Sequence, residues 1–314
     1  MTRKAPGKYW REGLSLIDIT RMFPDDATAE AWFAEQRWWG EPQCPVCNSY
    51  NVQSNCKHKT MPYRCRKKDC GKKFSVKTGT VMESSKLGYQ VWAIAIYLLT
   101  TSIKGVSSMK LHRDLGVTQK TAWFLAHRLR ETWDDFDTMA FDGPIEVDET
   151  YIGGKEKNKH ESKKLRAGRG TVGKLPVIGA KDRKTNRVVA RATDLTDKET
   201  LHTFIDGVAL EETMVYTDEA QAYSDLYFDH ETVKHSVGEY VRDMAHTNGI
   251  ESFWALMKRG YHGTYHKMSK KHLNRYVVEF AGRHNARPND TETQMELIAH
   301  GMLDKRLKYQ ELVA

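Results

Sequence analysis

Three acidic residues stand in segments where metal-dependent chemistry would need them. Asp148 lies near the end of the strand-like run IEVDET, where the strand is expected to leave the core. Asp218 ends the short run MVYTD, and Glu251 lies in the helix-like HTNGIESFWALMKRG. Carboxylates that gather in one place repel one another unless a divalent cation neutralises them, and hard oxygen ligands favour Mg²⁺ or Mn²⁺ over Zn²⁺. Two such ions about 3.5–4 Å apart support in-line displacement at phosphorus, so the three residues predict phosphodiester chemistry.

Each carboxylate also has a plainer interpretation. Asp148 and Asp218, taken singly, fit surface charges at strand ends or in turns. Asn248 and Glu251 have the spacing of a capping box, in which Glu251 would bond the backbone of its own helix. Helical spacing nevertheless places Asn248, Glu251 and Lys258 on one face, opposite an apolar side, so that face is free for a ligand or a partner.

The elements that must position these residues are strands and one helix. From residue 144 the chain changes to short β-rich runs, and helical segments follow to the end. A central mixed sheet with the 246–260 helix laid across it would bring the three carboxylates together. The sequence therefore predicts an α/β domain in this half of the chain.

The cysteines indicate a second metal site. Cys44 and Cys47 form a C-x2-C pair, Cys65 and Cys70 form a C-x4-C pair, and seventeen residues separate the pairs. Two such knuckles around one tetrahedral ion predict structural Zn²⁺, against the alternative of unrelated buried cysteines. Cys56, followed closely by a histidine, is an alternative fourth ligand.

The segment 107–131 has the pattern of two helices joined by a short turn. Gly116 suits the turn, and Thr118 suits the N-cap of the second helix. In a helix-turn-helix, Gln119 and Lys120 would begin the recognition helix and contact base edges. An ordinary αα-hairpin is the alternative for this segment taken alone.

Composition favours a polyanionic partner. The 314 residues carry 49 Lys and Arg against 41 Asp and Glu, a net charge of +8. The 155–170 segment is the most basic loop, and we expect DNA contacts from Lys155, Lys163, Lys164, Arg166 and Arg169, although such a run also fits a solvated mobile loop. The longest apolar run, 91–99, is too short to cross a bilayer, and the N-terminus does not have a secretory pattern, so we expect no membrane association and an intracellular location.

The motifs VDETYIGG, TDEAQAY and HTNGIESFWALMKRGYHGTYH, with CPVC and CRKKDCGKKFSVKTGT, resemble the DDE transposases of zinc-ribbon bacterial insertion sequences, the ISXO-like group related to Merlin elements. The resemblance covers most of residues 20–290. The sequence pattern predicts a multidomain chain whose parts are a helical lead-in (1–40), a zinc ribbon (41–82), a helix-turn-helix (86–135), an α/β domain with a mixed sheet (140–287) and a C-terminal helical tail (288–314). The resemblance implies that the 140–287 domain is a ribonuclease-H-like catalytic domain.

The resemblance also implies the site and its partners. Asp148 and Asp218 would hold catalytic Mg²⁺ or Mn²⁺. The third position in this group is either Asn or Glu, and we prefer Glu251 over Asn248 because carboxylate is the stronger ligand and Lys258 follows one heptad later. Lys258 and Arg259 would contact DNA phosphates.

The expected activity is cleavage of insertion-sequence ends and joining of the 3′ hydroxyl to target DNA, in a bacterial cytoplasm and on the nucleoid when DNA-bound. The partners would be double-stranded DNA of terminal inverted repeats and targets, and a second copy of the chain in a homodimer or larger assembly. A domesticated DNA-binding protein and a structure-specific nuclease are the alternatives.

Overall fold

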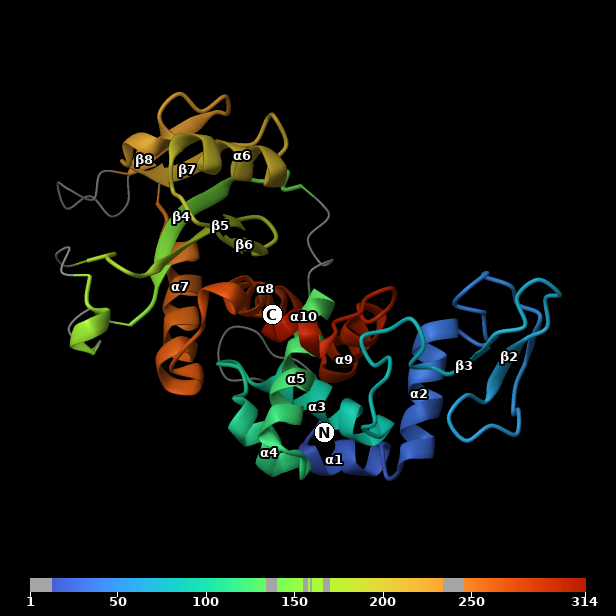
Figure 1. Ribbon diagram of the computed structural model, residues 1–314. Helices are drawn as coiled ribbons and strands as arrows, with labels where there is room; N and C mark the ends of the chain where they lie inside the picture. Colours follow the sequence, from blue (N-terminus) through green and yellow to red (C-terminus); the bar gives the residue numbers. More distant parts are fainter. Residues whose placement is uncertain (1–12, 134–139, 155–157, 159, 166–169, 234–245) are drawn as a thin grey trace. The chain divides into compact units, whose positions relative to one another are not determined.

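A computed structural model describes residues 13–133, 140–154, 158, 160–165, 170–233 and 246–314. The chain forms two compact units. The first unit combines residues 1–135 with residues 287–314, and the second unit comprises residues 136–286 (Figure 1).

The first unit is mainly helical. Several of its helices begin at polar caps: at the start of α2, for example, the Asp25 carboxylate accepts a hydrogen bond from Thr28 N–H at 2.8 Å. Buried aromatic and aliphatic side chains such as Phe33, Trp92 and Ile96 form its core. The elements before the second unit are α1 (Leu16–Met22), α2 (Asp26–Trp38), α3 (Tyr89–Thr101), α4 (Ser108–Leu115), α5 (Gln119–Arg130) and the 3-10 helix η1 (Glu131–Trp133).

The C-terminal residues complete this first unit. Helices α9 (Thr291–His300) and α10 (Tyr309–Val313) belong to it. The Leu14 amide donates to Thr291 Oγ1 at 3.2 Å, and the Arg128 guanidinium donates to the Leu307 carbonyl at 3.3 Å. The two ends of the chain therefore share one core.

A small three-stranded sheet carries the cysteines. Strands β1 (Val52–Gln53), β2 (Tyr63–Cys65) and β3 (Lys73–Phe74) pair antiparallel in that order. The Trp38 ring, at the end of α2, packs edge-on against Tyr63 at 4.8 Å between centroids. We call residues 44–74 the cysteine ribbon. Because its hydrophobic core is so small, cross-linking of the cysteines by a metal would matter to its stability.

The second unit is built on a five-stranded mixed sheet, as the sequence predicted. The strand order is β6-β5-β4-β7-β8; β4 pairs antiparallel with β5 and parallel with β7. The pair β5 and β6 is antiparallel, and the pair β7 and β8 is parallel. The strands are β4 (Ile145–Ile152), β5 (Leu175–Asp182), β6 (Val188–Ala192), β7 (Val215–Asp218) and β8 (His230–Val233).

Helices cover both faces of this sheet. Helix α6 (Lys198–Val208) packs with Ile145 and Val147 of β4, whereas α7 (Asn248–Gly260) and α8 (Lys270–Ala286) pack against the opposite face (Figure 1). Alternate residues of a strand point to opposite faces, so Glu146 and Asp148 lie on the α7 side. The remaining short elements of this unit are the 3-10 helices η3 (Glu161–Lys163) and η4 (Gln221–Tyr223) and the π-helical turn η6 (Tyr261–Tyr265).

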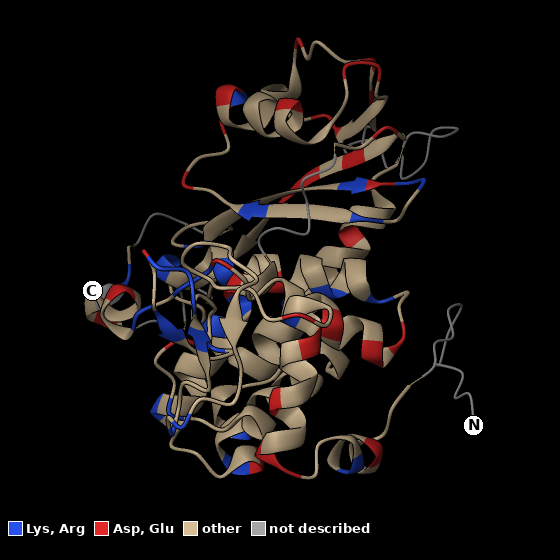
Figure 2. Cartoon of the chain, turned by 90° about the vertical axis from the view of Figure 1, so that its right-hand side faces the viewer, with Lys and Arg blue, Asp and Glu red and all other residues tan. Residues whose placement is uncertain are grey.

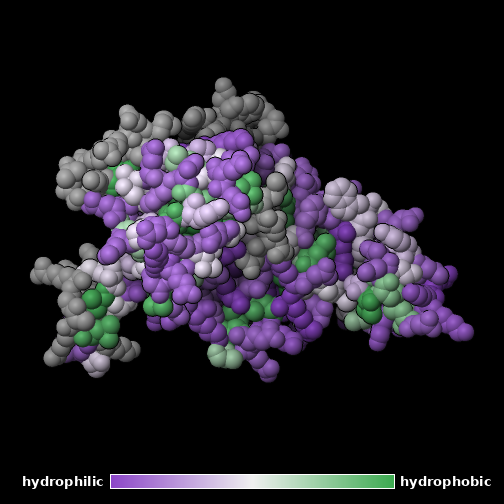
Figure 3. Space-filling view, turned by 90° about the horizontal axis from the view of Figure 1, so that it is seen from above, coloured by the Kyte–Doolittle hydropathy of each residue, from purple (hydrophilic) through white to green (hydrophobic). Residues whose placement is uncertain are grey.

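Among the described residues, no helix combines the length and the apolar character that crossing a membrane requires. On the face seen in Figure 3, hydrophobic residues form small separate groups among hydrophilic ones. That face therefore favours polar over apolar contacts.

Candidate functional site

Asp148 and Asp218 lie level with each other on neighbouring parallel strands. Ile145 pairs with Val215, and Glu146 pairs with Tyr216, so partners in this register differ by 70 in residue number. Asp148 and Asp218 also differ by 70, and the same register therefore places them level. The sequence pattern placed Asp148 where its strand ends, but β4 continues to Ile152. The pairing of β4 with β7 ends earlier, at Glu146 and Tyr216, so both carboxylates lie just beyond the paired residues of these two strands.

Helix α7 brings Glu251 to the same face of the sheet. Its apolar side, with Ile250, Phe253 and Trp254, is buried against the sheet, while Glu251 is exposed. Gly179 of β5 pairs with Asp148, and a Cβ at Gly179 would lie 2.6 Å from the Trp254 ring. Only a glycine therefore allows this close approach of α7 to β5.

The capping-box interpretation named Asn248 as the N-cap that pairs with Glu251, and this is wrong. The helix begins at Asn248, so Asn248 is not the cap; the N-cap is Thr247, whose side chain makes no capping hydrogen bond. The Thr247 hydroxyl instead donates to Glu251 Oε1 at 3.2 Å. Asn248, Glu251 and Lys258 are all exposed on one side of α7, as the helical spacing predicted.

The electrostatics show that the carboxylates share one environment. The pKa of Asp148 is raised to about 7, chiefly by burial and also by repulsion from Glu149, Asp218 and Glu251. The Glu149 N–H, which donates to Asp148 at 2.8 Å, opposes part of this effect. The Asp218 carboxylate accepts a hydrogen bond from Ala220 N–H at 3.0 Å. A bound divalent cation would relieve the repulsion, so the donor set suits a hard metal ion.

Two further acidic residues of β4 were not singled out from the sequence. The Tyr223 hydroxyl donates to Glu149 at 2.5 Å, and burial raises the pKa of Glu149. Glu146 is only 2% exposed and forms an ion pair with Arg183. The sequence did contain a signal for them: three of the four residues 146–149 are acidic, within a run that otherwise has the pattern of a strand.

The four predicted cysteine ligands do converge. Sγ of Cys44 lies 3.7 Å from Sγ of Cys70, Sγ of Cys47 lies 3.6 Å from Sγ of Cys65, and all four sulfurs lie within 4.8 Å of one another. A tetrahedral ion with Zn–S bonds of about 2.3 Å separates its sulfurs by roughly 3.8 Å. The cluster thus has the dimensions of a zinc site.

The environment of the cysteine cluster also favours a cation. The pKa of the Cys65 thiol is raised to about 12, chiefly by burial and also by hydrogen bonds with the other three thiols. A metal would compensate for this by stabilising the thiolates. Cys56 lies outside the cluster, with its thiol directed to the Gln53 carbonyl at 3.7 Å, so the alternative ligand is not supported.

Helices α4 and α5 form the predicted pair. Gly116 ends α4 with φ 63°, and the Thr118 hydroxyl accepts a hydrogen bond from Thr121 N–H at 3.2 Å. Gln119 donates to the Ser108 hydroxyl at 3.0 Å, and Lys120 Nζ lies 4.5 Å from the Tyr309 ring centroid. Both side chains are exposed but already make contacts within the first unit.

The predicted phosphate-binding cations are placed in part. Lys258 and Arg259 are exposed in the last turn of α7. Lys164 pairs with Glu161 at 2.6 Å, and the backbone of Lys163 lies in η3. Lys155, Arg166 and Arg169 lie outside the described residues.

Positive charge is also concentrated on the cysteine ribbon. Figure 2 shows Lys and Arg gathered on its strands. The exposed basic residues of the ribbon around β2 and β3 are Arg64, Arg66, Lys67, Lys68, Lys72 and Lys73. Only one acidic residue, Asp69, interrupts this run, so the surface suits a polyanion.

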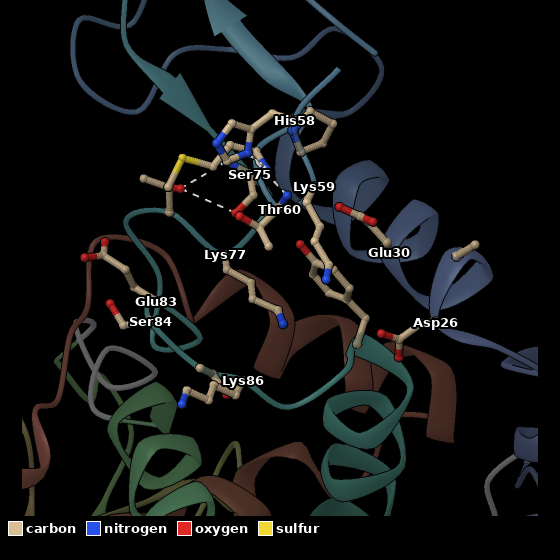
Figure 4. A pocket seen from close by; sticks show the side chains of 16 residues that line it. Asp26, Glu30, His58, Lys59, Thr60, Ser75, Lys77, Glu83, Ser84 and Lys86 are labelled. Carbon is tan, nitrogen blue, oxygen red and sulfur yellow. Dashed lines mark hydrogen bonds between the residues drawn. The ribbon is translucent and has the colours of Figure 1, made fainter. Parts of the chain in front are cut away.

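A pocket of about 1050 Å³ is lined only by residues of the first unit (Figure 4). Lys77 Nζ donates to the Leu87 carbonyl at 2.5 Å and lies 4.3 Å from the centroid of Tyr89, and burial lowers its pKa. The charged lining residues are balanced in sign: Asp26, Glu30 and Glu83 against Lys59, Lys77 and Lys86. Such a lining does not select a phosphate backbone.

Comparison with known proteins identifies relatives. Residues 140–285 match the ISXO2-like transposase domain. An uncharacterized protein in transposable element ISH50 of Halobacterium salinarum is 30% identical over 277 residues, which cover 83% of this chain and 91% of that protein.

Among solved structures, a chain of the simian T-cell lymphotropic virus intasome in complex with PP2A regulatory subunit B56 gamma matches with 14% identity and a TM-score of 0.29. The match covers 60% of this chain and 64% of that chain, less than two thirds of its length. At that TM-score the likeness carries no argument about the fold.

Proposed function

The chain belongs to the ISXO2-like transposase family, and from this premise we propose that it cleaves the DNA ends of an insertion sequence and joins the freed 3′ hydroxyl to target DNA. The observation that supports this most directly is the approach of Asp148, Asp218 and Glu251 from two strands and a helix. The raised pKa of Asp148, caused chiefly by burial and in part by repulsion from Glu149, Asp218 and Glu251, adds support.

In this proposal the three carboxylates hold two Mg²⁺ or Mn²⁺ ions. Such ions, when bound, activate the attacking oxygen and stabilise the leaving oxygen of an in-line phosphoryl displacement. Asp148 and Asp218 contribute from adjacent strands, and Glu251 contributes from the exposed side of α7. Asn248 stands one turn earlier on the same side and is the competing third ligand.

Exposed cations would hold the substrate. Lys258 and Arg259 follow Glu251 by two turns of α7, where they can neutralise a phosphate next to the metal ligands. The 155–170 segment would add sequence-independent contacts through Lys155, Lys163, Lys164, Arg166 and Arg169. Gln119 and Lys120 would contact base edges if α4 and α5 act as a helix-turn-helix, a role that requires them to leave their present partners.

The architecture proposed for this function is ribonuclease-H-like in the second unit. Three antiparallel strands followed by two parallel ones, with helices on both faces, support it. The cysteine cluster would hold structural Zn²⁺ and keep the basic ribbon folded. We also infer double-stranded DNA as the partner, in an assembly of at least two copies that holds paired ends.

The test is an assay of strand transfer. Labelled duplexes that carry the ends of the element are incubated with the protein, target DNA and Mg²⁺. Joined products, dependent on Asp148 and Asp218, are the expected result. Cut but unjoined ends would indicate a structure-specific nuclease instead, and bound but intact DNA would indicate a domesticated DNA-binding protein.

A further inference from the structure

Glu146 is a buried carboxylate next to the proposed metal site that the mechanism does not use. It lies two residues before Asp148 on the same face of β4 and is 2% exposed. A buried charge of this kind destabilises a fold unless partners compensate for it. Its partners therefore indicate what the residue does.

Those partners hold the beginning of α7. The Ile250 amide, in the first turn of the helix, donates to Glu146 Oε2 at 2.9 Å. The Arg183 guanidinium donates from Nε to Glu146 Oε1 at 2.9 Å and from Nη2 to the His246 carbonyl at 2.5 Å. His246 Nδ1 also lies 3.2 Å from Glu146 Oε1. One carboxylate thus links β4 to the helix and to His246 before it, and Arg183 bonds both Glu146 and the His246 carbonyl.

Other contacts support the same junction. Lys181 of β5 donates to the Gly249 carbonyl at 3.3 Å, and the Arg183 guanidinium lies 4.0 Å from the ring centroid of Tyr216 on β7. A Cβ at Gly249 would lie 2.6 Å from Glu146 Oε2, so the helix can approach this close only with glycine there. Residues of β4 and β5 therefore contact the first turn of α7 directly, whereas Tyr216 of β7 packs on Arg183, which bonds the residue before the N-cap.

We propose that Glu146 is a positioning residue, which fixes the first turn of α7 against β4 so that Glu251 stays in reach of Asp148 and Asp218. Ile250, whose amide Glu146 holds, is the residue immediately before Glu251. Since Glu146 and Asp148 are two residues apart on one strand, this contact links the strand ligand to the helix ligand over a short rigid path. The inference rests on the proposed function, because it assumes that Glu251 is a metal ligand.

The experiment measures Mn²⁺ affinity of the full chain by calorimetry, without DNA. Glu146→Gln keeps the size of the side chain but leaves only one acceptor oxygen. In the wild-type protein the Arg183 guanidinium and the Ile250 amide each donate to a different oxygen of Glu146. We expect the dissociation constant to rise roughly tenfold, as is typical when an outer partner of a metal ligand is lost. Gly249→Ala, which disturbs the same contact from the helix side without changing charge, should weaken binding in the same direction.

A double-mutant cycle separates positioning from general destabilisation. If Glu146 acts through Glu251, the double variant Glu146→Gln with Glu251→Gln should bind Mn²⁺ no more weakly than Glu251→Gln alone. Additive losses would contradict the proposal. So would an unchanged Mn²⁺ affinity of Glu146→Gln.

The matched control is Glu279→Gln. Glu279 is fully buried on α8, pairs with Arg283 at 3.4 Å and accepts a hydrogen bond from Tyr265 at 3.1 Å. Its substitution should lower thermal stability while leaving Mn²⁺ affinity unchanged. An equal loss of Mn²⁺ affinity in the control would show that any buried charge lost from this unit has the same effect, and would overturn the specific role of Glu146.

Amide hydrogen exchange gives a readout that does not depend on metal. Glu146→Gln should speed exchange across residues 248–252 more than Glu279→Gln does, because only Glu146 accepts a hydrogen bond from that turn. Unchanged exchange there would refute the positioning role. If wild-type protein and Asp148→Asn bound Mn²⁺ equally, the proposed function itself would be contradicted. The hydrogen-exchange result would then still test whether Glu146 fixes the first turn of α7.

Discussion

The cysteine cluster and the carboxylate cluster are both candidate metal centres, but they are assembled in opposite ways. The four cysteines come from two short knuckles within 27 residues, and their sulfurs already have tetrahedral spacing. The carboxylates come from residues 148, 218 and 251 and meet through sheet register and helix packing. Among the described residues, the four cysteines are the one set of three or more His, Cys, Asp or Glu side chains whose ligand atoms all lie within 4.8 Å of one another, so the three carboxylates are spaced more widely.

This difference indicates different roles. A closed set of four buried or half-buried thiols leaves no position for a substrate and suits a structural ion. The carboxylates lie where two strands separate and on the exposed side of a helix, so bound ions would keep positions for water or DNA. The following experiments test this contrast, from the largest expected effect to the smallest.

Removal of zinc should unfold the cysteine ribbon but spare the second unit. Structural zinc sites contribute about 10–16 kcal/mol of apparent binding free energy in small domains. Chelation, or Cys44→Ser, should therefore remove ordered signals of residues 44–74 in an NMR spectrum, with Mn²⁺ binding to the second unit retained. Cys56→Ser is the matched control and should keep bound zinc. A ribbon that stays folded after chelation would show that the cysteine site is not structural.

Loss of a strand carboxylate should abolish chemistry but spare the fold. Metal-ion catalysis supplies several kcal/mol of transition-state stabilisation, so Asp148→Asn and Asp218→Asn should each slow end cleavage by about 10³-fold or more. DNA binding, measured by gel shift, should remain. Glu211→Gln, an exposed acidic residue of the same unit, is the control.

The same cleavage assay assigns the third ligand. Glu251→Gln should reduce cleavage as strongly as the aspartate substitutions, and Asn248→Ala should reduce it less. The reverse ranking would assign the third position to Asn248.

The metal-free protein should lose stability as pH rises. The pKa of Asp148 is about 7 in the folded protein against 3.8 for the free side chain, so the folded state holds this proton more tightly. The contribution of Asp148 to the free energy of unfolding is therefore complete below about pH 4 and is lost as pH rises towards 7. Its upper limit is roughly 4 kcal/mol for a shift of about three pKa units.

Thermal unfolding of the second unit at pH 5 and pH 7.5 measures this effect. Saturating Mn²⁺ should raise the melting temperature more at the higher pH, and Asp148→Asn should remove most of the difference. A variant that kept the full pH dependence would assign it to other groups.

Substitution of the helix cations should have the smallest effect. Lys258→Ala and Arg259→Ala should each weaken DNA binding similarly for all sequences and reduce the slope of log affinity against log salt by about one. Lys267→Ala, an exposed lysine of the same unit beyond the π-helical turn, is the control. An unchanged salt slope would exclude these cations from the DNA interface.

The features predictable from the sequence are those with local causes. The knuckle spacing identified four sulfurs that do converge, and the turn and cap at Gly116 and Thr118 follow from their own conformational preferences. The 3.6-residue period separated the exposed and buried sides of α7. In each case the determining contacts lie within one element or one hairpin.

The features that were missed depend on contacts between distant segments. Glu146 is compatible with the core only because Arg183 and the Ile250 amide lie beside it, 37 and 104 residues away. No periodicity shows which cation will compensate a buried acid. The level placement of Asp148 and Asp218 likewise follows from parallel register, which neither strand encodes alone.

The second unit is an insertion within the first, since the chain leaves the helical unit after residue 135 and returns to it at residue 287. A premature stop after codon 286 would spare Asp148, Asp218 and Glu251 while deleting the partners of Leu14 and Arg128. Truncated copies of such a gene would therefore encode the complete second unit beside a first unit that has lost part of its core. A search of gene copies for these three acidic residues alone would count such truncated copies as intact.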